Sequence, residues 1–187
     1  MINIINLLKP ILPAQFDKNE FYVLAITIIV GISFFVLQKR FQLLLKTEMI
    51  CLYVFNLLFA QVGDRILAEP PLDFYNTLDR DYGELFDSIL QIFVYRFPIM
   101  IAVQIFWKFK PNSLIYILLC AFILSMFEWI SVRIFDVFQY NNWSTWYSFG
   151  FYCMAVLVNL IFYKKIHKII KERRSTNFKK LNKETLG

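Results

Sequence analysis

The chain has 187 residues, of which 58% are hydrophobic and only 18% carry a charge. Soluble globular proteins are about 45–50% apolar and about 25% charged, so this composition argues against a soluble domain and indicates a single integral membrane domain. Residues 164–187 hold nine basic and two acidic residues, so this segment alone accounts for the whole net charge of +6. Because the rest of the chain is close to neutral, the sequence lacks the basic folded face that nucleic-acid binding requires.

Five apolar stretches follow one another along the chain, each close to the ~17–25 residues that a helix needs to cross a bilayer. Backbone polar groups inside hydrocarbon must be satisfied within the segment, so these stretches are predicted to be helices. The sequence therefore predicts an all-α, polytopic transmembrane helical bundle over residues 1–163. We expect its five spans at about residues 21–37, 44–67, 86–107, 114–132 and 146–163.

The distribution of Lys and Arg predicts the orientation of this bundle, because basic residues accumulate in short cytoplasmic loops. They are concentrated in the first connection, the third connection and the tail, and are few on the opposite side. We therefore expect the N-terminus outside, the C-terminus in the cytoplasm and a multi-pass location in the plasma membrane. Residues 1–12 are expected to form a short interfacial segment rather than a cleaved signal.

The connection at residues 63–87 is the most polar part of the predicted outer side. It holds seven acidic residues against two basic ones. Clustered carboxylates bind Ca²⁺ or Mg²⁺, but the run from Asp79 to Gly83 lacks the third acidic ligand and the spacing of a calcium loop. We expect a solvated acidic loop without a metal, with a short surface helix at residues 75–85.

Two ionisable residues lie deep inside the spans, Arg96 in the third and Glu128 in the fourth. Arg96 is nine residues from Asp87 and Glu128 is eight from Asp136, which gives depths of about 14 Å and 12 Å at about 1.5 Å per residue. Because these spans are consecutive antiparallel helices, the two charges are expected to meet. Pro98 is expected to kink the third span and to release a backbone carbonyl.

The predicted pair has two interpretations that the sequence leaves open. It is either a structural ion pair that pins two helices together, or part of an outward-facing polar cavity for an ion or a lipid headgroup. In the second case the rim of the pocket is expected to include Asp64, Asp87, Tyr95 and Trp129.

The other polar groups of the spans are expected to have structural roles. Interhelical hydrogen bonds are predicted for Asn56, Gln61 and Asn159. Glu48 is expected to pair with Lys46 or with a residue of the tail, whereas His167, the single histidine, has no evident partner. The three cysteines are expected to be buried thiols without a disulfide.

The basic cytoplasmic tail, residues 164–187, is expected to continue the fifth helix along the inner leaflet. Three isoleucines share one helical face there, and each basic residue near an anionic membrane contributes about 1 kcal/mol of attraction. The alternative is a topology signal without a recognition role. The residues expected to bind anionic lipid are Lys164, Lys165, Lys168, Lys171, Arg173 and Arg174.

Several short elements over about half of the chain carry a resemblance. They are Asp64 after the second span, the run Pro-Pro-Leu-Asp-Phe-Tyr at residues 70–75, Tyr-Gly-Glu-Leu at 82–85, Pro98, Phe-Glu-Trp at 127–129, and Tyr-Asn-Asn-Trp at 140–143 followed by Tyr147 and Ser148. Their order resembles an uncharacterised family of small multi-pass membrane proteins found in endospore-forming Firmicutes. The resemblance implies a bacterial cytoplasmic membrane and no assigned activity.

No nucleophile-elbow, zinc-protease, P-loop or dinucleotide-binding motif occurs, so no catalytic residue, cofactor or metal is expected. We expect first a non-catalytic binding or assembly component with an outward-facing polar pocket. The alternatives are a subunit of an oligomeric transporter or channel, lined by Arg96 and Glu128, and a membrane enzyme acting on lipid headgroups through Asp64, Asp87 and Glu128. The expected partners are the lipid bilayer and either a second copy of the chain or a membrane partner protein.

Overall fold

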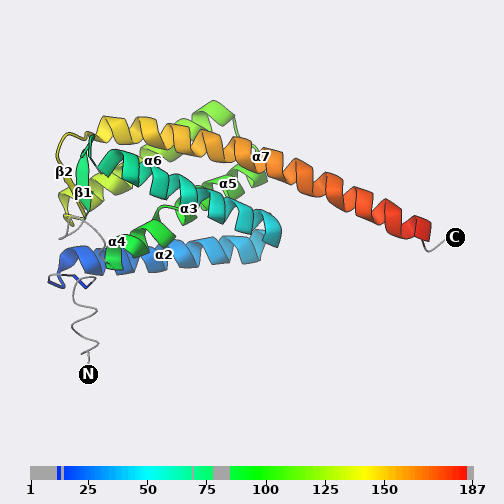
Figure 1. Ribbon diagram of the computed structural model, residues 1–187, viewed down its shortest axis with the longest axis horizontal. Coiled ribbons are helices and arrows are strands. Elements are labelled where there is room, and N and C mark those ends of the chain that lie inside the picture. The colour runs from blue at the N-terminus through cyan, green and yellow to red at the C-terminus, as the bar shows by residue number, and fades with distance from the viewer. Residues whose placement is uncertain (1–11, 14, 69, 78–84, 185–187) are drawn as a thin grey trace, which may run out of the picture.

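A computed structural model describes residues 12, 13, 15–68, 70–77 and 85–184, with side chains as far as residue 176. Nearly all of the predicted interfacial segment at residues 1–12, and residues 78–84 of the acidic connection, lie outside the described residues. The described chain forms helices that run along the long axis of the molecule and one two-stranded sheet (Figure 1). We call the end with the sheet the sheet end, and the opposite end, from which α7 projects, the tail end.

Within the described residues, five helices are long and apolar enough to cross a membrane, which confirms the predicted number of long apolar helices. The third span has 44% of its most apolar window buried, against 11–22% for the other four, so it is the central helix of the bundle. The five helices are Lys18–Phe41 (α2), Lys46–Ala68 (α3), Leu85–Phe109, Ser113–Arg133 (α6) and the Thr145–Thr176 part of α7.

Helix α2 starts three residues before its apolar stretch because polar side chains cap its first turn. The Asp17 carboxylate accepts a hydrogen bond from the backbone N–H of Asn19 at 3.0 Å, and the Glu20 carboxylate accepts one from the backbone N–H of Asp17 at 2.8 Å. This capping box satisfies N–H groups that have no partner within the helix.

The third span is interrupted near its middle, as the position of Pro98 predicts. Proline has no N–H to donate and its ring crowds the carbonyl four residues earlier, so a helix kinks or breaks there. The backbone carbonyl of Ile92 accepts a hydrogen bond from Arg96 Nη1 at 3.1 Å, so a side-chain donor satisfies a backbone acceptor near the break. The span consists of Leu85–Ile89 (α4), the π-helical segment Leu90–Val94 (η1) and Phe97–Phe109 (α5).

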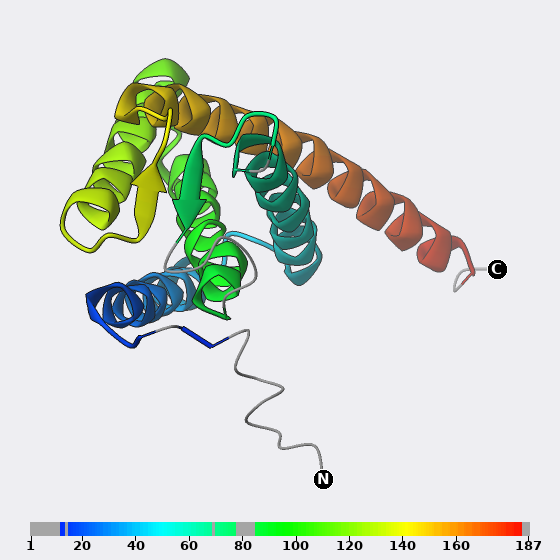
Figure 2. The same cartoon turned by 60° about the vertical axis from the view of Figure 1, so that its left-hand side comes forward.

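Two short strands form an antiparallel pair at the sheet end (Figure 2). They are Tyr75–Thr77 (β1) and Phe138–Tyr140 (β2), with Tyr75 opposite Tyr140. The prediction of a surface helix at residues 75–85 is therefore wrong at its start. The reason is that β1 pairs with a strand that follows the fourth span, a partner that the local sequence does not reveal.

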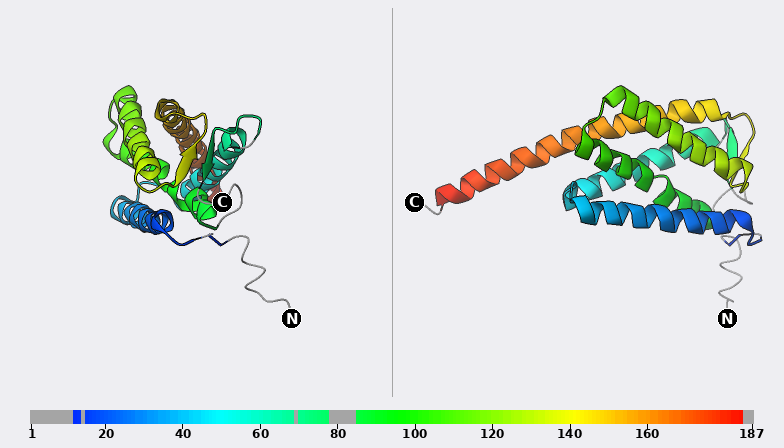
Figure 3. Two further views of the ribbon diagram at one scale, coloured as in Figure 1. Left: turned by 90° about the vertical axis from the view of Figure 1, so that its left-hand side faces the viewer. Right: turned by 180° about the vertical axis from the view of Figure 1, so that it is seen from behind.

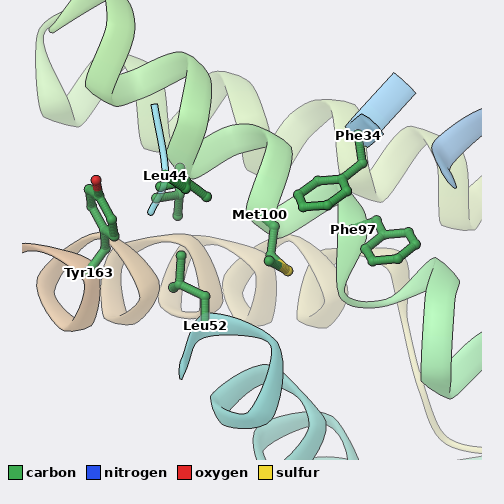
Figure 4. Packing of buried hydrophobic residues seen from close by; sticks show 7 residues of the cluster. Phe34, Leu44, Leu52, Phe97, Met100 and Tyr163 are labelled. Atoms are coloured by element: carbon green, nitrogen blue, oxygen red, sulfur yellow. The ribbon is translucent and has the colours of Figure 1, made fainter. Parts of the chain in front are cut away.

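The largest apolar cluster joins four of the five spans (Figure 4). The ring of Phe34 in α2 stacks on the ring of Phe97 in α5, with centroids 4.9 Å apart. Helix α2 packs mainly on the three segments of the third span. The buried members of the cluster are Phe34, Leu44, Leu52, Phe97, Met100, Val103 and Tyr163.

Helix α6 packs along α7 rather than along the third span that precedes it (Figure 3). Its contact with α5 includes the hydroxyl of Tyr116, which donates to the carbonyl of Ala102 at 2.7 Å. A cluster of Ile99, Ala155 and Val156 fills the space between α5 and α7, and side chains of α6 pack against it. Helix α2 packs on the third span and α6 packs on α7, so α2 and α6 are far less closely packed on each other.

Helix α7 is unbroken over the 40 residues Thr145–Glu184. It leaves the bundle at the tail end and continues beyond it in nearly the same direction (Figures 1 and 3). The prediction that the fifth helix continues into the tail is confirmed. The prediction that the tail lies along the inner leaflet stays a prediction.

Candidate functional site

A cavity of about 550 Å³ lies inside the bundle, a volume typical of small-molecule sites. Residues from all five spans and both strands line it, and most of them are Ile, Val, Leu, Phe or Ala. The two carboxylates that line it are Asp64 of α3 and Glu128 of α6. Both face the part of the cavity next to β1 and β2, so the cavity is apolar along its walls and acidic at the sheet end.

The cavity opens sideways between α2 and α6. Ile29 of α2 and Ile123 and Phe127 of α6 line it, and these side chains are 58%, 44% and 49% exposed. The cavity wall therefore continues onto the molecular surface between these helices.

Polar and aromatic contacts tie α2 to α6 at the sheet end of this opening. The hydroxyl of Ser131 donates to the Tyr22 hydroxyl oxygen at 2.9 Å, and the Tyr22 ring stacks on Phe135 with centroids 4.1 Å apart. Lys18 of α2 and Asp136, in the connection that follows α6, form a separate exposed ion pair. The two Tyr22 contacts hold the sheet end of the opening together.

Glu128 is the acceptor for three hydroxyl groups from two other elements. Ser148 of α7 donates to Oε1 at 2.5 Å, the Tyr140 hydroxyl of β2 also donates to Oε1, and Tyr152 of α7 donates to Oε2 at 2.6 Å. The indole N–H of Trp143 donates to the Ser148 hydroxyl oxygen at 2.7 Å. The three O–H donors occupy acceptor sites on both oxygens of one carboxyl group.

Asp64 is the centre of a second polar group. The Tyr75 hydroxyl of β1 donates to its Oδ1 at 2.8 Å, and the Gln91 amide of η1 donates to its Oδ2 at 3.0 Å. The same amide nitrogen lies 3.1 Å from Oδ2 of Asp87 in α4. Gln91 therefore links two carboxylates that come from different spans.

Aromatic rings enclose the sheet end of the cavity. The ring of Tyr75 lies 6.1 Å from the ring of Phe138 and 6.1 Å from that of Trp143, measured between centroids. The ring of Tyr95 stacks on Phe138 at 6.5 Å. All four residues line the cavity, so aromatic faces and carboxylate oxygens border the same space.

The two strand tyrosines have strongly raised phenol pKa values. Burial raises the pKa of Tyr75, and the charge and hydrogen bond of Asp64 raise it further. Burial also raises the pKa of Tyr140, with the Glu128 carboxylate as the second cause. Both phenols therefore stay protonated at neutral pH and act as hydrogen-bond donors to the carboxylates.

Arg96 does not meet Glu128, so the predicted pair is wrong. Its Nη1 donates to the Tyr53 hydroxyl at 2.9 Å, and its guanidinium lies 4.9 Å from the centre of the Tyr53 ring. The side chain is fully buried, and Nε and Nη2 have no hydrogen-bond partner among the described residues. The two depths agreed, but α6 packs on α7 and turns Glu128 toward α7 and β2, whereas Arg96 turns toward α3.

The predicted rim residues have different positions in the structure. Asp64 and Tyr95 line the cavity, and Asp87 is joined to Asp64 through Gln91. Trp129 is 42% exposed and does not line the cavity. Successive helical residues are about 100° apart, so Phe127 and Trp129 lie on opposite sides of Glu128, and of these two only Phe127 lines the cavity.

Sequence reasoning did not identify the hydroxyl partners of Glu128. Ser148 and Tyr152 are four residues apart, so they lie on one face of α7. This pair of hydroxyl groups on one face of a mostly apolar helix is the signal that could have indicated a buried acceptor.

A separate polar contact joins α3 to α7 at the tail end. His167 Nδ1 lies 2.7 Å from Oε1 of the fully buried Glu48, and the Tyr163 hydroxyl lies 3.4 Å from Oε2. The prediction that Glu48 pairs with a tail residue is confirmed, and the prediction that His167 has no partner is wrong. All six tail bases expected to bind lipid have exposed side chains.

Of the three interhelical hydrogen bonds predicted for neutral polar residues, those of Asn56 and Asn159 form and that of Gln61 does not. Asn56 of α3 donates to the Asn159 side-chain oxygen of α7 at 2.7 Å, which confirms an interhelical bond for both. Gln61 is exposed and forms no hydrogen bond with any described residue, so its predicted bond is wrong. The three cysteines are free and half-buried.

Within the described ranges, no three His, Cys, Asp or Glu side chains come close enough together to hold a metal ion. Comparisons with protein-family models, curated proteins and solved structures found no match. The resemblance to the family from endospore-forming Firmicutes therefore stays a prediction.

Proposed function

We propose that this protein is a non-catalytic, multi-pass protein of the bacterial plasma membrane that binds an amphipathic molecule in its central cavity. In this proposal the N-terminus and the sheet end face outward, and the tail is cytoplasmic. The ligand's apolar chain occupies the space between α2 and α6, and its polar head lies at the sheet end.

The observation that carries this proposal is the shape and lining of the cavity. Its walls are apolar, its carboxylates lie at the sheet end, and exposed side chains of α2 and α6 mark a lateral opening. In a bilayer this opening faces hydrocarbon, so a lipid-like molecule can enter sideways without passing through water. Its head then reaches the polar groups at the sheet end of the cavity.

Cavity filling tests this proposal directly. The assay is equilibrium binding of four labelled dodecyl amphiphiles at submicellar concentration to protein in amphipol. The four heads are ammonium, trimethylammonium, sulfate and maltoside. Ala60 of α3 lines the cavity, so Ala60→Phe is expected to abolish binding of every amphiphile that the native chain binds.

Ala25→Phe is the matched control, because Ala25 lies on the exposed face of α2 and does not line the cavity. It is expected to leave binding unchanged. The proposal is overturned if no amphiphile binds, or if Ala60→Phe binds as well as Ala25→Phe.

The proposed orientation places the tail bases beside the cytoplasmic leaflet, where anionic lipid would attract them. Two measurements check this. A C-terminal reporter is expected to be active only in the cytoplasm. Replacing the six tail bases by Gln is expected to remove the preference of the reconstituted protein for anionic over neutral vesicles.

Transport is the second candidate, and the interruption of the third span favours it. Discontinuous helices at mid-depth form the binding sites of many secondary transporters. Here the interruption lies beside the buried Arg96, and Tyr95 next to it lines the cavity. Concentration-dependent flux of a bound amphiphile in proteoliposomes would establish transport, and binding without flux would leave the protein as a binding component.

A further inference from the structure

We infer that the sheet end of the cavity is a site for a cationic headgroup, an alkylated or free ammonium group. This inference rests on the proposed function and specifies the class of ligand. The site is bordered by Asp64, Glu128, and the rings of Tyr75, Tyr95, Phe138 and Trp143.

The charge of the cavity favours a cation. Asp64 and Glu128 are acidic, and no Lys, Arg or His occurs among the described residues that line the space. Arg96 is buried outside the lining, with Tyr53 as its side-chain partner. A positive head beside the Glu128 carboxylate, whose described partners are neutral hydroxyls, gains attraction that is strong in a poorly solvated site, and a negative head is repelled.

Four of the hydroxyl donors at this end already donate to protein carboxylates. The hydroxyls of Tyr140, Ser148 and Tyr152 donate to Glu128, and that of Tyr75 donates to Asp64. A phosphate or sulfate head needs donors, and these are engaged. An ammonium head brings its own N–H donors or positively charged methyl groups. The Glu128 carboxylate has about four acceptor sites and accepts from three hydroxyls, so it can accept one further hydrogen bond.

The aromatic enclosure supplies the second kind of contact that an ammonium group requires. Ring faces attract cations within about 6 Å, and cages of aromatic side chains recognise quaternary ammonium groups. The ring of Tyr75 lies 6.1 Å from both Phe138 and Trp143, and Tyr95 closes the side toward the third span. Aromatic faces beside carboxylates thus form an ammonium site at the polar end of an apolar channel.

Head selectivity in the same dodecyl series tests the inference. The native chain is expected to bind the ammonium and trimethylammonium amphiphiles at least about tenfold more tightly than the sulfate and maltoside amphiphiles. Lysophosphatidylethanolamine is added to distinguish the source of the ammonium group. If lysophosphatidylethanolamine binds more tightly than dodecylammonium, the natural ligand is a lipid with an ammonium headgroup. If it binds more weakly, the natural ligand is a free amine.

Glu128→Gln is expected to reduce the preference for ammonium heads about tenfold while leaving maltoside binding unchanged. Asp136→Asn removes the same charge from the exposed ion pair with Lys18 and is expected to keep the preference. If Glu128→Gln does not yield a folded protein, Asp64→Asn tests the same point at the second carboxylate.

The outcomes separate the two proposals. Equal binding of all heads, lost in Ala60→Phe, would leave the proposed function standing and overturn the cationic site. Tighter binding of dodecyl sulfate would overturn it as well. Absence of binding for the whole series would overturn both.

Discussion

Tyr152→Phe removes one hydroxyl group from the Glu128 cluster without changing the shape of the ring. Neutral interhelical hydrogen bonds in membranes contribute only about 0.6 kcal/mol on average. Here the acceptor is a carboxylate, and Tyr152 is the single described donor to Oε2. Hydrogen bonds to charged groups contribute about 1.5–3 kcal/mol, so we expect this loss in the free energy of unfolding. Tyr140→Phe should cost less, because Ser148 still donates to Oε1.

The assay is thermal unfolding, followed by tryptophan fluorescence in one fixed detergent. A protein of this size loses about 2–4 °C of Tm per kcal/mol, so Tyr152→Phe should lower Tm by about 3–12 °C. Tyr147→Phe is the matched control, because Tyr147 lies on the same helix and is 60% exposed. The reasoning is refuted if Tyr152→Phe matches this control, or if Tyr140→Phe lowers Tm more than Tyr152→Phe.

Two further predictions follow from the strand tyrosines and from the central amide pair. Because the pKa values of Tyr75 and Tyr140 are raised, the unfolded chain releases their protons near pH 10 while the folded chain retains them. The contribution of these tyrosines to the free energy of unfolding is complete below about pH 10 and falls above it by up to about 1.4 kcal/mol per pH unit for each tyrosine. Chemical denaturation at a series of alkaline pH values measures this fall. The unfolding free energy of Tyr75→Phe should decrease less steeply with pH than that of the native chain, and an equally steep decrease would contradict the assignment. A double-mutant cycle of Asn56→Leu and Asn159→Leu should give a coupling of about 0.6–1.7 kcal/mol in unfolding free energy, and additive losses would contradict the direct bond.

The five spans could be predicted because hydropathy reports the solvent that each segment needs. The break in the third span was also predictable, because Pro98 removes a backbone donor at a known position. The depth of Arg96 and of Glu128 followed from the helical rise.

The direction in which each charge points could not be predicted. It depends on which helices pack together, and consecutive spans need not be the closest neighbours. Helix α6 packs on α7, so Glu128 accepts hydrogen bonds from Ser148 and Tyr152 and does not pair with Arg96. The β1–β2 pair was missed for a similar reason, because each strand is only three residues long and its partner lies two spans away.

Because α7 is one continuous helix, it can act as a rigid rod that connects the cavity to the tail. Its first turns carry Ser148 and Tyr152 beside the acidic end of the cavity, and its last residues lie about 60 Å away at about 1.5 Å per residue. A tilt of about 5° around the first turns would sweep the far tip through about 5 Å over that length. Because no kink absorbs the movement, small displacements at one surface of the membrane would be magnified at the other.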